Sequence, residues 1–241
     1  MTCRCAAEGN AAVPKRKESL EKQRARAVAI YDRLYQRYPD VRCTLNRKNA
    51  FQLLIATILA AQCTDARVNI VTRTLFKKYR KPQDYLNAPV EELEQDIRST
   101  GFYRMKAKNI RGLCRTLIDE YGGKVPNTMD ALLRLPGVGR KTANVVLGDC
   151  FGVQGVVVDT HCGRLARRMG FTENIDPWKV EQDLMRVWPE NRWSLFGHLM
   201  VFHGREICTA RKPRCGECPV NDLCPYPNSI NQTVKIRSRT G

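Results

Sequence analysis

The chain has 241 residues, 43% of them hydrophobic and 27% charged, so it is long enough to bury a core in one large domain or two modest ones. Lysine and arginine number 41 against 24 aspartates and glutamates. The resulting net charge of +17 is spread along the chain and favours a polyanionic partner over a merely solvated surface. No apolar run reaches the roughly 18 residues that span a bilayer, which excludes a membrane-spanning helix.

The periodic segments of the chain are helical, and no segment alternates as a strand does, so we expect an all-α fold. Residues 1–25 are predicted to be a disordered basic extension, and 227–241 a flexible basic tail. Between them, apolar residues recur at spacings of three and four, and prolines, glycines and capping residues separate the segments. The expected helices cover approximately 27–38, 50–61, 68–79, 90–97, 110–121, 128–134, 140–150, 160–169, 177–187 and 193–207.

The stretch from Leu135 to His161 combines three chemical features. A Pro-Gly-Val-Gly turn at 136–139 separates two helical segments, and its glycines let a ligand approach the backbone closely. The helix that follows begins at once, so its free N–H groups and its positive dipole end suit a phosphate. Lys141 lies at this helix start, and Asp159 follows eighteen residues later. A phosphate site, an amine and a carboxylate are the components of a reaction centre.

Each of these residues also has a simpler interpretation. Lys141 could be an exposed helical lysine or a phosphate contact. Asp159, in the sequence V-D-T-H, could cap the helix that starts near Thr160. A carboxylate there can fill that role and still stabilise positive charge on a sugar that is losing its base.

Four of the eleven cysteines cluster near the C-terminus, with six, two and five residues between them: Cys208, Cys215, Cys218 and Cys224. The other seven are scattered, which favours a reducing compartment with one metal site over a disulfide framework. Zinc and a [4Fe–4S] cluster both accept four thiolates. Arg211, Lys212 and Arg214 lie between the first two ligands, on a loop that metal bonds would hold ready for phosphate.

The sequence L-P-G-V-G-R-K-T-A followed by V-D-T-H resembles the helix-hairpin-helix plus Gly/Pro-Asp signature of DNA glycosylases. With Lys141 and the cysteine spacing, the chain is similar to the endonuclease III family from about Tyr31 to Cys224. The resemblance implies a six-helix bundle at 43–153 with the helix-hairpin-helix, an iron–sulfur lobe formed by 26–42 plus 154–226, and a DNA-binding groove between them. It also favours a [4Fe–4S] cluster over zinc.

The resemblance further implies the roles of the site residues. Lys141 would be the nucleophile and Asp159 its carboxylate partner, while Gln62 and Phe102 would fill the gap left by an extruded nucleotide. Phe102 could equally be a core aromatic, and His161 could contact the opposite strand or hydrogen-bond Asp159. The full set of expected DNA contacts is Gln62, Phe102, Gly137, Val138, Gly139, Arg140, His161, Arg211, Lys212 and Arg214.

The function implied by the resemblance is that of a bifunctional DNA glycosylase and abasic-site lyase in base excision repair. Such an enzyme removes oxidised pyrimidines through a lysine Schiff base and cuts the strand by β-elimination. A monofunctional adenine mismatch glycosylase and a non-catalytic DNA-binding module are the alternatives. The expected partner is double-stranded DNA with damaged bases or abasic sites, bound by a monomer away from membranes. A cytoplasmic or nucleoid location is expected in a bacterium, with nuclear and mitochondrial locations left open.

Overall fold

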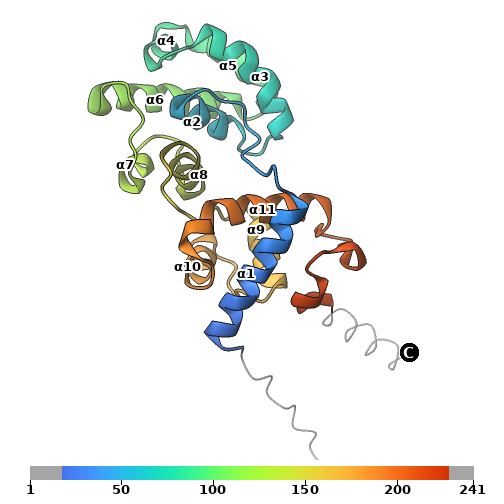
Figure 1. Cartoon of the computed structure of the whole chain (residues 1–241). Helices are drawn as coiled ribbons and strands as arrows, with labels where there is room; N and C mark the ends of the chain where they lie inside the picture. The colour runs from blue at the N-terminus through green and yellow to red at the C-terminus, as the bar shows by residue number, and fades with distance from the viewer. Residues whose placement is uncertain (1–17, 228–241) are drawn as a thin grey trace, which may run out of the picture.

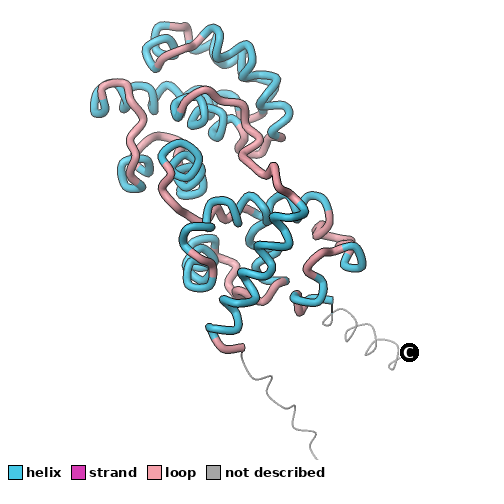
Figure 2. Tube along the Cα trace, viewed as in Figure 1, coloured by secondary structure: helices cyan, strands magenta, loops and turns pink. Residues whose placement is uncertain are grey.

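The computed structural model describes residues 18–227, and in this range the chain is made of helices and loops without a strand (Figure 2). The N-terminal extension up to residue 17 and the tail from 228 lie outside the described residues. Within 18–227, no helix is both long and apolar enough to cross a bilayer. The α-helices are α1 Leu20–Arg37, α2 Ala50–Leu59, α3 Asp65–Lys78, α4 Pro82–Asn87, α5 Val90–Ile97, α6 Tyr103–Tyr121, α7 Met129–Leu133, α8 Arg140–Phe151, α9 Thr160–Arg168, α10 Pro177–Val187 and α11 Trp193–Glu206.

The first helix begins earlier than its apolar pattern indicates. Ser19 caps α1 by accepting a hydrogen bond from the Lys22 backbone N–H at 3.4 Å, and Glu21 adds an acid in the first turn. Residues 20–25, which the sequence assigned to a disordered extension, are therefore helical. Their side chains are mostly exposed, so no apolar stripe marks them.

One hydrophobic core is formed by the helices from α2 to α8. Helix α2 is its centre, because eight of its ten residues are buried. Seven α-helices lie between residues 50 and 151, one more than the expected six. The additional one is the short α4, which Pro82 begins and whose buried Tyr85 stacks on Tyr79 with ring centroids 4.7 Å apart.

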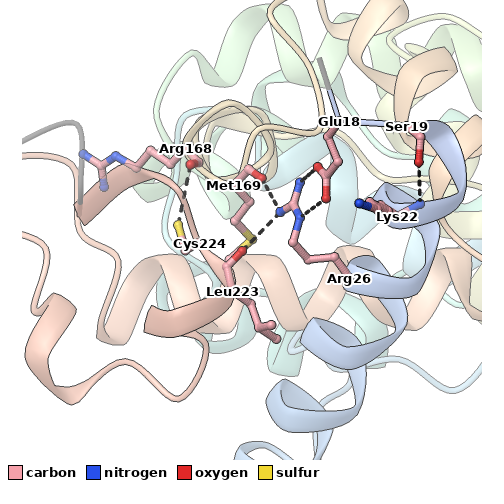
Figure 3. Close-up of polar contacts among 8 residues, drawn as sticks. All are labelled: Glu18, Ser19, Lys22, Arg26, Arg168, Met169, Leu223 and Cys224. Carbon is pink, nitrogen blue, oxygen red and sulfur yellow. Dashed lines mark hydrogen bonds and ion pairs between the residues drawn. The ribbon is translucent and has the colours of Figure 1, made fainter. Parts of the chain in front are cut away.

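A second core is formed by α1, α9, α10 and α11, with the rings of Tyr31, Trp188 and Phe196 packed together. Figure 3 shows how α1 is fixed to the C-terminal part of this lobe. The Arg26 guanidinium donates to the carbonyls of Met169 at 2.6 Å and Leu223 at 3.3 Å, and pairs with the Glu18 carboxylate at 2.7 Å. Residues from opposite ends of the described chain thereby form one unit.

The two cores form separate lobes in Figure 1, joined by the segments 38–49 and 152–159. The second connection leads directly from α8 of the first lobe to α9 of the second.

Candidate active site and metal-cluster site

The turn between α7 and α8 is shaped by a glycine that no other residue could replace without strain. Gly137 has a φ of +77°, and a Cβ there would lie 2.9 Å from the Asn109 Cβ of α6. Gly139 is the N-cap of α8 and has no side chain to bond the first turn, while the space around it is open. The N–H groups at the start of α8 therefore face a surface that an anion can approach.

Two residues expected to contact DNA in this turn also have partners within the protein. The Val138 side chain is buried, and its N–H donates to the Leu135 carbonyl at 3.1 Å, so neither group faces solvent. The Arg140 guanidinium points to α10, where it forms a bidentate pair with Glu181 at 2.6 and 2.9 Å. Asn144 donates to the same carboxylate at 3.2 Å. Arg140 thus joins the lobes, and 37% of its side chain remains exposed.

Lys141 and Asp159 line one cavity of about 180 Å³ at the boundary between the lobes. In residues 18–227, neither the Lys141 amine nor the Asp159 carboxylate has an ion-pair partner. The cavity walls come from the ends of α2 and α3, from α8 and from α11. The lining residues are Arg42, Cys43, Thr44, Leu45, Thr57, Ala60, Ala61, Asp65, Lys141, Thr142, Val145, Val157, Asp159, His198, Val201, Phe202 and Arg205.

Asp159 is also the N-cap of α9. Its Oδ1 accepts a hydrogen bond from the Cys162 backbone N–H at 2.7 Å, as the sequence V-D-T-H predicts for a cap. This bond fixes the side-chain rotamer and leaves the other carboxylate oxygen without a protein donor among the described residues. The cap and a role in the cavity are therefore compatible.

Two polar links between the lobes escaped the sequence analysis. The Asp65 carboxylate at the start of α3 accepts from the Arg205 guanidinium of α11 at 3.1 Å. Near the other end of α8, Asp149 accepts from Arg47 at 3.0 Å and lies 3.2 Å from the His198 ring. No local pattern marks these pairs, because the partners are more than 40 residues apart in sequence.

Gln62 and Phe102 are the two non-glycine residues with positive φ in the described part of the chain, at 53° and 49°. Both side chains are exposed, and 67% of the Phe102 surface is accessible. The interpretation of Phe102 as a core aromatic is therefore wrong. A bulky ring kept exposed on a strained backbone is a feature of binding sites.

His161 follows Asp159 by two residues but hydrogen-bonds elsewhere. Its Nδ1 lies 3.1 Å from the Arg164 guanidinium, and no bond to Asp159 is formed in the described structure. Burial lowers the pKa of His161, the Asp159 charge opposes this effect, and the charges of Arg164 and Arg205 reinforce it. The ring is therefore biased toward its neutral form.

The four clustered cysteines line one pocket beneath α9 and the end of α11. The Arg168 guanidinium donates to the Cys208 sulfur at 3.2 Å, and the buried His203 ring lies 3.3 Å from the Cys218 sulfur. Within residues 18–227, no three ligand-type side chains converge as they do around a single ion. Four thiols around one pocket, with a cation donating to a sulfur, form a donor set suited to an iron–sulfur cluster.

All three cations of the loop between the first two cysteines are exposed, but they differ in their partners. Arg211 and Lys212 are exposed and have no ion-pair partner among residues 18–227. Arg214 instead holds the loop together, donating to the Glu206 carbonyl at 2.9 Å and to the Glu217 carboxylate at 2.8 Å. Arg214 thus has partners within the protein, whereas Arg211 and Lys212 have no ion-pair partner among the described residues.

Comparison with known proteins agrees with this arrangement. Residues 55–190 match the model of the HhH-GPD superfamily of base excision DNA repair proteins, and residues 208–224 match the iron–sulfur binding domain of endonuclease III. Endonuclease III of Bacillus subtilis (strain 168) is 50% identical over 198 residues, which cover 80% of this chain and 89% of that protein. The chain belongs to the endonuclease III family. Endonuclease III of Synechocystis sp. is 49% identical over 211 residues, 87% of this chain and 95% of that protein.

Solved structures of the family have the same architecture. A trapped endonuclease III–DNA covalent intermediate superposes with a TM-score of 0.82 at 49% identity, covering 86% of this chain and 97% of that one. A non-covalent endonuclease III–DNA complex also has a TM-score of 0.82, at 47% identity, covering 90% and 100%. The chain is accordingly a DNA N-glycosylase and abasic-site lyase of base excision repair that acts on DNA and carries a [4Fe–4S] cluster. The monofunctional and non-catalytic alternatives are not favoured.

Proposed function

We propose that Lys141 is the nucleophile of this enzyme and Asp159 the carboxylate that assists it. The observation that carries the proposal is their position in one cavity, each supplied by a different lobe and neither neutralised by an ion pair within residues 18–227. The Lys141 amine, once deprotonated, attacks C1′ of the damaged nucleotide, and the C1′–N bond to the base breaks. The Asp159 carboxylate stabilises the positive charge that develops on the sugar and accepts a proton from the attacking amine.

The second half of the reaction follows from the covalent adduct. Opening of the sugar ring gives a Schiff base between Lys141 and C1′, which acidifies the C2′ proton. Removal of that proton forms the C1′–C2′ enamine system, and the electron pair then expels the 3′ phosphate by β-elimination. Water finally hydrolyses the imine and restores the free amine.

We propose that three surfaces of the protein bind the DNA. The open N–H groups of Gly139 and the first turn of α8 bind a phosphate beside the reacting sugar. Gln62 and Phe102, exposed on their strained turns, fill the space vacated by the extruded nucleotide. Arg211 and Lys212 hold a more distant phosphate, and the neutral His161 ring faces the opposite strand.

The cluster ligands are Cys208, Cys215, Cys218 and Cys224, and the group they hold serves to brace the loop that carries Arg211. Base removal by displacement and elimination transfers no net electrons, so the cluster is not a reagent. The proposed substrates are oxidised or ring-saturated pyrimidines. Because the curated relatives are bacterial, we place the enzyme in the cytoplasm, with the chromosomal DNA of the nucleoid as its site of action.

A strand-incision assay on two duplexes tests this proposal. One duplex carries a single abasic site and the other a single oxidised pyrimidine, with undamaged DNA as the control. We expect incision of both damaged duplexes on the 3′ side of the lesion. Incision of neither, despite tight binding, would instead support a non-catalytic DNA-binding module, and base loss without incision would support a monofunctional glycosylase.

A further inference from the structure

Lys106, in the first turn of α6, is the most buried lysine that the structure describes, with 4% of its surface exposed. Its ammonium group donates hydrogen bonds to the carbonyls of Leu59 at 2.7 Å and Thr100 at 2.8 Å. Lysines are rarely buried to this degree without an acidic partner, and residues 18–227 supply none. This group therefore requires a specific explanation.

The two carbonyls lie at corresponding places in the chain. Leu59 is the last residue of α2, and Gln62 follows it by three positions. Thr100 ends the short 3-10 helix η1 (Arg98–Thr100), and Phe102 follows it by two positions. The Lys106 ammonium group therefore bonds the backbone just before each of the two residues with positive φ, Gln62 and Phe102.

The physical role of a cation at these positions is clear. The last carbonyls of a helix lack partners within the helix and carry its negative dipole end, so a positive charge with three donors satisfies them well. Burial lowers the pKa of Lys106, and the neighbouring Cys63 opposes that effect. A strained backbone conformation persists only where several surrounding contacts hold it in place. Here the Lys106 side chain holds both strained turns, that of Gln62 and that of Phe102.

We propose that Lys106 is a positioning residue for lesion extrusion: it ties the α2 and η1 ends together, so that Gln62 and Phe102 enter the gap in the duplex as one preset pair. The inference rests on the gap-filling role proposed above for those two residues. It predicts that Lys106 matters when a nucleotide must be extruded from a duplex. It also predicts that Lys106 is dispensable when there is no stacked duplex to open.

The test compares a substrate that requires extrusion and base removal with one that requires strand cleavage alone, and it measures extrusion separately by fluorescence. One is a duplex with an oxidised pyrimidine and 2-aminopurine in the opposite strand, whose fluorescence reports unstacking. The other is single-stranded DNA with a ready-made abasic site. Lys106→Met removes the donors at nearly constant volume. Lys124→Met, at an exposed site just beyond the end of α6, is the matched control.

We expect Lys106→Met to slow base removal from the duplex by about ten- to hundredfold and to reduce the fluorescence change, because a displacement near 1 Å has such effects. Cleavage of the single-stranded abasic site should remain at the wild-type rate, and Lys124→Met should change neither. Lys106→Arg, which keeps a cation and its donors, should recover part of the duplex activity. If Lys106→Met does not fold, the two substrates are compared with Lys106→Arg instead.

A double-mutant cycle separates the two proposals. In a Gln62→Ala, Phe102→Ala background, adding Lys106→Met should cause no further loss on the duplex, because its effect passes through those side chains. Equal losses on both substrates, or a full additional loss in that background, would mean that Lys106 only supports the fold. If instead the two alanine substitutions themselves leave extrusion unchanged, the gap-filling proposal fails, whatever Lys106 does.

Discussion

Arg140 and Glu181 join the two lobes beside the reaction centre, with the Arg140 Nε 2.6 Å and its Nη2 2.9 Å from the carboxylate oxygens. The carboxylate is buried, with 5% of the side chain exposed, whereas the guanidinium is partly accessible. Arg140 immediately precedes Lys141, so the ion pair fixes the start of α8 relative to the lobe that carries Asp159. Two adjacent cations thus have different surroundings: Arg140 pairs with a buried carboxylate, and Lys141 has no ion-pair partner among the described residues.

Removing the guanidinium should cost more stability than neutralising the carboxylate. Arg140→Met leaves the buried Glu181 charge with Asn144 as its remaining donor among the described residues, and we expect a loss of about 2–4 kcal/mol in the free energy of unfolding. Glu181→Gln keeps hydrogen-bonding atoms in place and should cost less. Urea denaturation of both variants measures the difference. Losses below about 0.5 kcal/mol in both would show that the pair does not hold the lobes together.

The link between Asp149 and His198 predicts a pH-dependent contribution to stability. Burial alone would raise the pKa of Asp149, but hydrogen bonding and charge from His198, together with Arg47, lower it overall. A lowered folded-state pKa contributes stability that is present above the ordinary value of 3.8 and is lost as the pH falls below it. The wild-type advantage over Asp149→Asn in melting temperature should therefore be larger at about pH 5–6 than below about pH 4. The exposed Asp119→Asn is the control, and an advantage that does not change with pH would contradict the account.

The structure predicts that cations of the cluster loop contribute unequally to DNA binding. Replacing Arg211 and Lys212 with Gln should flatten the dependence of log K on log salt by about 0.9 for each phosphate that is no longer neutralised, equally on damaged and undamaged DNA. Arg214→Gln should instead lower the stability of the loop, because Arg214 bonds Glu206 and Glu217. An unchanged slope in the first variant would remove this loop from the binding surface.

The four thiols predict a visible, essential cofactor. Pure protein should be yellow-brown with broad visible absorbance, and Cys215→Ser should lose iron and fold poorly, because metal binding is coupled to folding. Iron and sulfide analysis of both proteins is the measurement. A colourless, active preparation with one zinc per chain would overturn the cluster assignment.

Features with a local cause were predictable from the sequence. The all-helical fold follows from apolar spacing, and the cap at Asp159 follows from its position before a helix start. Helix α4 was missed because it has only six residues and one deeply buried aromatic, Tyr85, which is too little for a periodic pattern. The first turns of α1 were missed because they bury almost nothing.

Features that depend on distant partners were not predictable. Nothing near Lys106 marks it as buried, since the carbonyl of Leu59 that it bonds is 47 residues away. The pairing of Arg140 with Glu181 was hidden as well, because Glu181 lies 41 residues away on another lobe. Val138 illustrates the same limit, since the turn motif does not reveal that its N–H is already bonded within the hairpin. The motifs predict which residues belong to the site, whereas contacts with distant parts of the chain determine which of their polar groups are already hydrogen-bonded.

The Asp159→Asn substitution distinguishes the role of Asp159 as the N-cap of α9 from its proposed role in base removal. Asn is also a good N-cap, so the melting temperature should change little, whereas Asp159→Ala should lower it by removing the bond to the Cys162 N–H. Both variants lack the carboxylate charge, so both should slow base removal far more than they slow cleavage of a ready-made abasic site, where no base must leave. Equal slowing of both steps by Asp159→Asn would assign the residue to strand cleavage instead.

Borohydride trapping with Lys141→Gln tests the central claim most directly. Borohydride reduces a Schiff base to a stable amine, so wild-type protein should form a covalent adduct with abasic-site DNA that survives denaturing electrophoresis. Lys141→Gln keeps a side chain of similar shape without the amine and should still bind damaged DNA while forming no adduct and removing no base. An adduct of normal yield from Lys141→Gln would mean that another amine does the chemistry and that Lys141 only contacts phosphate.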